Sequence, residues 1–125
     1  MKLFFFLLLL SSQAFALNWF DLEAGKNYTL KQSFQLPQKE RSGSMLEFSQ
    51  GDVLTLKEII GLGMGLGLFN FSYPQCPGPQ METDVEIIPV SGTATEIGAM
   101  AAEGCELWIY VELKDFWTPS LLEVR

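Results

Sequence analysis

Histidine is absent from this chain of 125 residues, and cysteine occurs only twice. Without histidine, Ser-His-Asp and Cys-His nucleophile systems are excluded, and two cysteines cannot form a zinc finger. Paired carboxylates can hydrolyse glycosides, but no spacing singles out one pair among the 15 Asp and Glu residues. We therefore expect a protein that is not an enzyme and that carries no cofactor.

Glu82, Asp84 and Glu86 are the carboxylates whose spacing comes closest to a metal site. They alternate along a predicted strand, so their side chains share one side of it. A calcium ion needs six to eight oxygen ligands that wrap around it, usually from a loop with a sharp glycine turn. The apolar Ile87 and Ile88 follow instead. We expect a solvated acidic face here and no metal.

Cys76 and Cys105 are an even pair of cysteines. In an exported chain such a pair normally forms a structural disulfide, here closing a loop of about 30 residues. A redox role would need a close Cys-x-x-Cys pair, which the sequence lacks. We predict one structural disulfide between these two residues.

Residues 1–16 have the organisation of a secretory signal peptide. One lysine precedes an unbroken apolar run over residues 3–10, and the tripeptide Ala-Phe-Ala ends at Ala16. A membrane anchor would need roughly 20 apolar residues, more than this run provides. We expect cleavage after Ala16, which leaves a single exported domain over residues 17–125.

The net charge of −7 bears on the partners and the compartment of this domain. Nucleic acid and anionic lipid headgroups both require a basic face, so neither is an expected partner. We favour a bacterial envelope, with the protein periplasmic or secreted. Asn27 and Asn70 each begin an Asn-x-Ser/Thr tripeptide, so a eukaryotic secretory route stays open.

The alternation of apolar and polar residues predicts a mainly β fold. It is clearest over residues 28–36 and 105–113, and further strands are expected at 45–48, 53–58 and 85–90. Thr93 and Glu96 have the spacing of a helix capping box. We expect an all-β fold, a small barrel or sandwich of about five to seven strands with at most one short helix, over about residues 93–102.

The segment Leu-Glu-Phe-Ser-Gln-Gly-Asp-Val-Leu-Thr-Leu, residues 46–56, resembles the diverging-turn segment of Src homology 3 domains and their bacterial relatives. The resemblance implies a five-stranded, strongly bent barrel, a fold often used to bind peptides or cell-wall polymers. The tandem Trp strand that follows the turn in that family has no match here, where residues 59–71 stand instead. The resemblance thus extends to a small barrel, and an oligonucleotide-binding-type barrel or a sandwich has the same strand count.

Residues 59–71 contain four glycines that alternate with apolar residues. In a single strand these glycines would form one bare face, against which Trp108, Trp117 or the predicted short helix can pack. We favour such a buried strand. The alternative is an exposed apolar loop that contacts a membrane, a partner or a second copy of the chain.

Trp108 and Tyr110 alternate with charged residues on the outer face of the predicted strand 105–113, and Trp117 follows shortly after. Aromatic side chains with charged neighbours suit contacts to proteins or glycans. We expect a non-catalytic module that binds a protein or glycan partner in the envelope through these three residues. A strand covered on both faces is the simpler explanation of the first two aromatics.

Two other functions remain open from the sequence. The first is an envelope-associated, membrane-associated or self-associating protein that uses residues 59–71. The second is an inhibitor of a secreted hydrolase that presents the loop 74–79, held in place by Cys76.

Overall fold

The structure of the chain is a computed structural model. It describes residues 17–39, 43–76, 78, 81–90, 96–117 and 121–125. The expected signal peptide, residues 1–16, lies outside the described residues.

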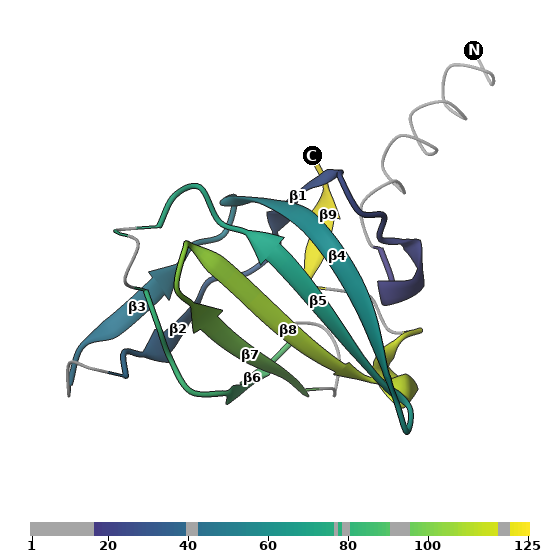
Figure 1. The fold of residues 1–125 in the computed structure, drawn as a ribbon. Coiled ribbons are helices and arrows are strands. Elements are labelled where there is room, and N and C mark those ends of the chain that lie inside the picture. Colours follow the sequence, from purple (N-terminus) through teal and green to yellow (C-terminus); the bar gives the residue numbers. More distant parts are fainter. Residues whose placement is uncertain (1–16, 40–42, 77, 79–80, 91–95, 118–120) are drawn as a thin grey trace, which may run out of the picture.

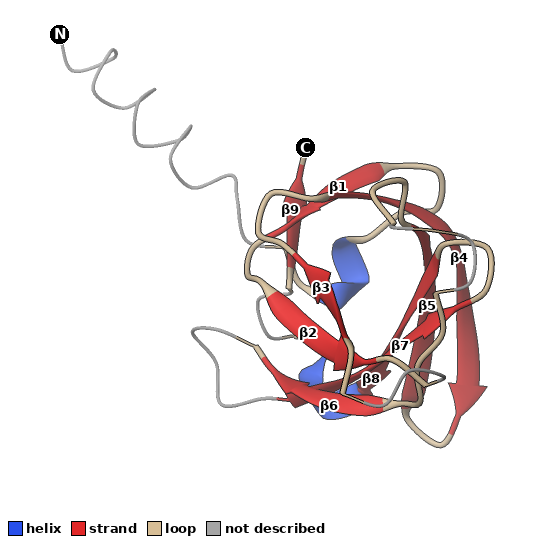
Figure 2. Ribbon diagram, turned by 90° about the vertical axis from the view of Figure 1, so that its left-hand side faces the viewer, coloured by secondary structure: helices blue, strands red, loops and turns tan. Residues whose placement is uncertain are grey.

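A curled antiparallel sheet of seven strands dominates the fold, and a two-stranded sheet accompanies it (Figure 1). The elements in chain order are η1 Trp19–Asp21, β1 Asn27–Leu30, β2 Phe34–Pro37, β3 Met45–Phe48, β4 Val53–Gly63, β5 Leu66–Ser72, β6 Glu86–Pro89, β7 Glu96–Ala102, β8 Glu106–Glu112, η2 Leu113–Asp115 and β9 Leu122–Val124. The large sheet has the order β6-β7-β8-β5-β4-β1-β9. Figure 2 shows it as a half-barrel, with β2 and β3 completing the ring between β9 and β6. The expected small, mainly β fold is confirmed.

The inner face of the half-barrel holds one contiguous apolar core. On β8, the side chains of Leu107, Ile109 and Val111 are fully buried, whereas Trp108 and Tyr110 between them are half-buried on the outer face. This period of two is what a strand with one face in the core requires. The strand predicted over residues 105–113 is therefore confirmed over Glu106–Glu112.

The predicted strand over residues 28–36 is divided between two sheets. β1 belongs to the large sheet and β2 to the small one, and residues 31–33 between them are not in a strand. The Lys31 N–H donates to the Leu121 carbonyl, which holds the chain against the residue before β9 where it leaves the large sheet. The alternation survives the break, because Tyr28, Leu30 and Phe34 are all buried.

The predicted helix over residues 93–102 is wrong where the structure describes it, because residues 96–102 form β7. Residues 93–95 lie outside the described residues. β7 pairs with β6 on one side and with β8 on the other, so its backbone hydrogen bonds go to both neighbours. Ala99 and Ala101 face the core and Gly98 faces outward, and these small residues do not mark a strand in the sequence. Sheet pairing overrides the weak helix signal.

Residues 59–71 form a hairpin instead of the expected single strand. Gly63, Met64 and Gly65 all have positive φ angles, 72°, 56° and 74°. Gly63 pairs with Leu66, so Met64 and Gly65 are the two central residues of a tight turn between β4 and β5. Positive φ at both central positions is typical of a type I′ hairpin turn. Gly63 and Gly65, which continue the strand pattern in the sequence, are thus, with Met64, the residues that reverse the chain.

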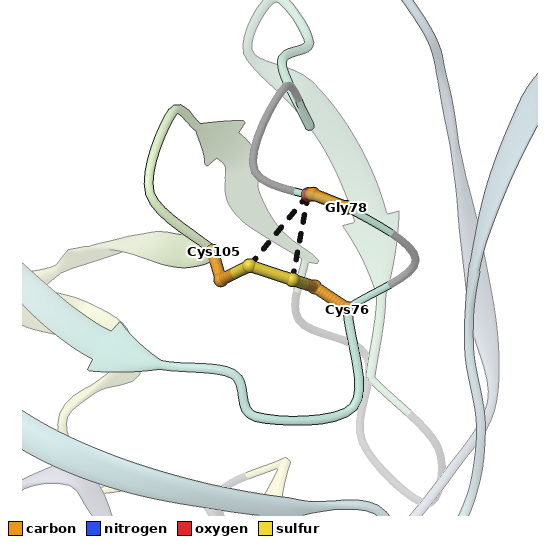
Figure 3. Close-up of a disulfide and its surroundings, with 3 residues drawn as sticks. All are labelled: Cys76, Gly78 and Cys105. Atoms are coloured by element: carbon orange, nitrogen blue, oxygen red, sulfur yellow. Dashed lines mark hydrogen bonds between the residues drawn. A yellow bond between two sulfur atoms is a disulfide. The ribbon is translucent and has the colours of Figure 1, made fainter.

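The disulfide joins Cys76 to Cys105, with 5.7 Å between the two Cα atoms, as predicted (Figure 3). The Gly78 carbonyl oxygen lies 3.4 Å from the Cys76 sulfur and 3.6 Å from the Cys105 sulfur. Disulfide sulfurs carry no proton, so these are close contacts without a shared hydrogen. The bond ties the loop after β5 to the start of β8. Within the described part of the chain, no helix has the length and apolar character needed to cross a membrane.

Candidate functional site

Trp108 and Tyr110 lie side by side on the outer face of the sheet. Trp108 is opposite Asn70 on β5 and Met100 on β7, while Tyr110 is opposite Gly98 on β7. A Cβ atom at Gly98 would be 3.3 Å from the Tyr110 Cβ, so the tyrosine packs closely over this glycine. Both aromatic residues are half-buried. This exposure is intermediate between the two arrangements expected from the sequence, a strand covered on both faces and an open contact face.

A polar network adjoins Trp108. The carboxylate of Glu106 accepts from the Lys57 ammonium at 2.8 Å and from the Asn70 amide at 3.1 Å. The Lys57 hydrogen bond, aided by the one from Asn70, keeps the pKa of Glu106 below its usual value although burial opposes it. Asn70 is only 2% exposed. The outer face therefore combines an aromatic ring with a small, ordered set of polar groups.

Trp117 belongs to a different part of the molecule. Its ring lies 4.5 Å from that of Phe20, which in turn meets the ring of Phe116 at 4.9 Å. Phe116 contacts Gly67 on the inner face of β5, since a Cβ atom there would be 2.8 Å from the Phe116 Cζ. Gly67 faces the opposite side of the sheet from Tyr110. The three predicted contact residues therefore do not form one surface.

Large exposed apolar side chains gather instead at the end of the β4–β5 hairpin. Among the described residues, nine large apolar side chains are exposed, and five of them lie here. This distal cluster consists of Phe20, Ile59, Met64, Leu113 and Trp117. Trp117 is 71% exposed and Met64 is fully exposed. Exposed apolar residues that are scattered singly are normal, whereas a concentration of them is typical of a contact surface.

An apolar cleft of about 270 Å³ opens within the distal cluster. η1 and Phe116 form one side of it, and the inner face of the hairpin forms the other. Its lining residues are Trp19, Phe20, Leu22, Ile59, Ile60, Gly61, Gly65, Leu66, Gly67, Phe69 and Phe116. The volume is just below the range typical of small-molecule sites, so the cleft has room for one or two apolar side chains. A second hollow, around Met64 and Leu113, shares Gly65 and Leu66 with the cleft.

The short η1 turn is held in place at both of its ends. The Phe20 N–H donates to the Asn18 side-chain oxygen at 3.1 Å, and the Asn18 N–H donates to the Asp21 carboxylate at 3.2 Å. This reciprocal capping satisfies the free backbone donors of the turn. The Trp19 N–H donates to the Phe116 carbonyl at 3.0 Å, and the Trp19 ring lies 5.0 Å from that of Phe69. Trp19 is thereby fixed as the buried wall of the cleft.

Carboxylates outnumber unpaired cations around the cleft. Lys26 forms an ion pair with Glu23 at 2.5 Å, and Lys114 forms one with Glu112 at 3.4 Å. Asp21, beside the lining residues Phe20 and Leu22, and Glu58, beside Ile59, form no ion pair within the part of the chain that the structure describes. Next to the distal cluster, burial raises the pKa of Asp115, an effect that Lys114 opposes and Glu112 reinforces. The surroundings of the cleft are acidic.

No group of three or more metal-ligating side chains occurs among the described residues. Glu82 and Asp84 approach the Lys39 ammonium at 3.6 and 3.8 Å. The strand predicted to carry them is wrong, because β6 begins only at Glu86 and Thr83 makes just an isolated bridge to Gln38. The loop 74–79 is described only in part. Pro74 and Gln75 are exposed in it, and Cys76 anchors it.

Neither family models, nor curated proteins, nor solved structures yield a match to this chain. The cleft is therefore understood from its own geometry. Sequence reasoning named residues 59–71 as a contact segment only in second place and did not find η1 or Phe116 as its partners. Exposed Phe20 and Trp117 near the two ends of the domain were the available signal, but nothing local in the sequence connects them.

Proposed function

We propose that the protein is a non-catalytic, exported binding module that holds a protein partner by inserting apolar side chains of that partner into the distal cleft. The observation that carries the proposal is the gathering of the exposed distal cluster around a preformed apolar cleft. Binding hot spots are typically apolar or aromatic residues that surround such a pocket. This proposal keeps the expected function and moves its site from Trp108 and Tyr110 to the hairpin end.

Export is supported by two observations. The signal-like sequence precedes the domain. The disulfide between Cys76 and Cys105 is of a kind that persists in oxidising compartments.

Met64 gives independent support to a contact role for the hairpin end. Type I′ turns favour asparagine or glycine at this position, because an L side chain with positive φ is strained. A fully exposed methionine there stabilises nothing in the fold. An apolar side chain at the most exposed point of the hairpin is explained by a contact that the isolated chain does not make.

The test is affinity capture from the envelope fraction of cells that produce the protein, using the wild type and a double variant, Met64→Asn with Trp117→Ser. Asparagine suits the positive φ at position 64, so we expect the melting temperature to stay unchanged or to rise slightly. Capture of the partner should fall at least about tenfold, the effect of losing roughly 1.4 kcal/mol of contact energy.

The matched control is Met45→Ser, which removes an exposed apolar side chain on β3, away from the cleft. This variant should capture as much partner as the wild type. Unchanged capture by the double variant, together with loss of capture by Trp108→Ala and Tyr110→Ala, would transfer the site to the outer face.

A glycan-binding surface on that outer face is the second candidate. It is favoured by the polar network of Lys57, Glu106 and Asn70 beside the Trp108 ring, since sugar sites combine an aromatic face with charged and amide groups. Binding of the protein to immobilised envelope polysaccharide, lost in Trp108→Ala and kept in Met64→Asn, would establish it.

A further inference from the structure

The strand β4 runs on beyond the strand that pairs with it on one side. β1 pairs with Val53–Thr55, and Leu56 makes the last hydrogen bonds on this side: its N–H donates to the Lys26 carbonyl and its carbonyl accepts from the Gly25 N–H. β5 accompanies β4 as far as Gly63. Among the described residues, positions 57–63 therefore have a strand neighbour on the β5 side only. Figure 2 shows this part of β4 at the rim of the molecule.

Ile59 and Gly61 direct their backbone groups to the free side. Residues in an antiparallel strand face their two neighbouring strands alternately. The Tyr73 N–H donates to β8, so Phe69 and Gly67, an even number of residues earlier, also face β8. Ile59 is paired with Phe69 and Gly61 with Gly67, which places both outside the β4–β5 hydrogen bonds. The register therefore leaves the N–H and C=O groups of both residues without a strand partner among the described residues.

This free edge and the apolar cleft belong to one groove. Ile59 and Gly61 both line the cleft, and no atom lies within 4 Å of a Cβ built on Gly61. η1 lies across the cleft from this edge, because Trp19 and Phe20 line the same cleft, and Figure 1 shows it in dark purple beside the middle of β4. A row of unused backbone groups next to an apolar pocket is the arrangement that receives an added strand.

We propose that this groove binds an extended segment of the protein partner, which adds as a strand to β4 and places alternate apolar side chains in the cleft. This inference rests on the proposed function and specifies how the partner is recognised. The backbone of Ile59 and Gly61 provides the hydrogen bonds, and the cleft selects the side chains.

The added segment is cationic. Asp21 and Glu58, next to the groove in the sequence, form no ion pair with any residue that the structure describes, and the chain as a whole has a net charge of −7. A second copy would bring the same charge to the same edge, and like charges repel. Lysine or arginine residues between the apolar ones would meet these carboxylates, so a basic foreign segment fits the groove better than another copy of this chain.

The binding experiment uses the purified, disulfide-bonded protein and three fluorescein-labelled heptapeptides. The first alternates lysine with leucine, the second has glutamate in place of lysine, and the third is the first with alternate N–H groups methylated. Fluorescence anisotropy measures the affinity of each. We expect the lysine peptide to bind at least about tenfold more tightly than the glutamate peptide, and methylation to cost about tenfold, roughly one or two hydrogen bonds.

Gly61→Pro tests the same contact from the protein side. Proline removes a backbone N–H that faces the free edge and leaves the hydrogen bonds to β5 in place, as edge strands tolerate. We expect about tenfold weaker peptide binding. Met45→Ser, which changes an exposed side chain on β3 outside the groove, is the control. This control should bind within about twofold of the wild type.

Four results would overturn the inference. Equal binding of the methylated and unmethylated peptides would exclude strand addition and leave the apolar contact standing. Equal binding of the lysine and glutamate peptides would refute the cationic partner alone. A dimer in sedimentation equilibrium that Gly61→Pro dissociates would assign the edge to a second copy. Binding to phosphatidylcholine vesicles but to none of the peptides, lost in Met64→Asn, would replace both this inference and the proposed function with a lipid surface.

Discussion

The two ends of the β4–β5 hairpin are built from the same strands but differ in how far their apolar side chains are buried. At one end, Leu54, Leu56 and Phe71 are completely buried beneath the rest of the barrel. At the other end, Ile59 is 45% exposed and Met64 fully so. Register shifts between Leu56 and Glu58 and between Gly61 and Gly63 interrupt the alternation along β4, but the two strands stay paired. The difference arises because β1 stops pairing at Leu56, while β5 continues to the turn.

This contrast separates the residues that stabilise the fold from those available for contacts. An apolar residue stabilises the fold only where another element removes it from water. The end of the hairpin at Leu54, Leu56 and Phe71, here called the sealed end, meets this condition. The end at Ile59 and Met64, here called the open end, keeps apolar area that a partner can bury. Substitutions at the sealed end should therefore change stability, and those at the open end should change binding.

The largest effect is expected from shortening one apolar side chain at each end of the hairpin to alanine, in separate variants. Phe71→Ala should lower the free energy of unfolding by about 4 kcal/mol, because it leaves a cavity in the core. Ile59→Ala should lower it by less than about 1 kcal/mol, since its side chain is already half in water. Urea denaturation of both variants measures the difference. Equal losses would mean that the open end is part of the core.

Removal of the disulfide comes next. Replacing both Cys76 and Cys105 by serine should cost about 3.5 kcal/mol, from the entropy of the unfolded loop that the bond restrains. The bond lies at the sealed end, so peptide affinity measured well below the melting temperature should stay within about twofold of that of the wild type. A large loss of affinity in the folded variant would contradict the independence of the two ends.

Two paired glycines give a smaller and more local comparison. Gly67→Ala should destabilise the protein by about 1.5 kcal/mol, because the new Cβ would approach the Phe116 ring at 2.8 Å. Gly61→Ala, directly across the hairpin, should have almost no effect, since its Cβ meets nothing within 4 Å. Thermal melting measures both variants. Equal melting temperatures would mean that Phe116 does not pack against Gly67 as the structure has it.

The smallest effect concerns Tyr73, whose hydroxyl donates to the Asp52 carboxylate at 2.5 Å at the sealed end. Burial, together with that hydrogen bond, raises the pKa of Tyr73 above its ordinary value of 10.0. The native state therefore favours the protonated ring, and its contribution to stability is complete below pH 10 and lost at higher pH. Tyr73→Phe should cost about 1 kcal/mol at neutral pH and flatten the alkaline loss of stability. A steeper alkaline loss in the variant would contradict this assignment.

The sequence predicts the sealed end far better than the open one. The strands at 53–58 and 105–113 are evident because aliphatic residues recur there at every second position, and the core enforces that period. The turn at Met64 is hidden, because glycines and apolar residues continue the same alternation through it. The helix expected over residues 93–102 fails for a related reason, since the alanines and glycine of β7 fit a strand only when its neighbours are known.

The cleft could not be predicted from the sequence, for a different reason. Its walls come from η1, the β4–β5 hairpin and Phe116, and no periodic pattern links segments so far apart. Trp117 illustrates the limit. Its type marks it as a contact residue, but only its packing against Phe20 shows that it lies apart from Trp108 and Tyr110.

The hydrogen bond from Trp19 to Phe116 determines when, during synthesis, the cleft can form. It joins the beginning of the domain to residues close to its end, and the middle of the chain supplies the facing wall. A nascent chain still emerging in the N-to-C direction carries η1 and the hairpin but lacks the residue that fastens them. The cleft is therefore complete only after the chain has been synthesised beyond Phe116, and a chain that stops before this residue lacks one of its walls.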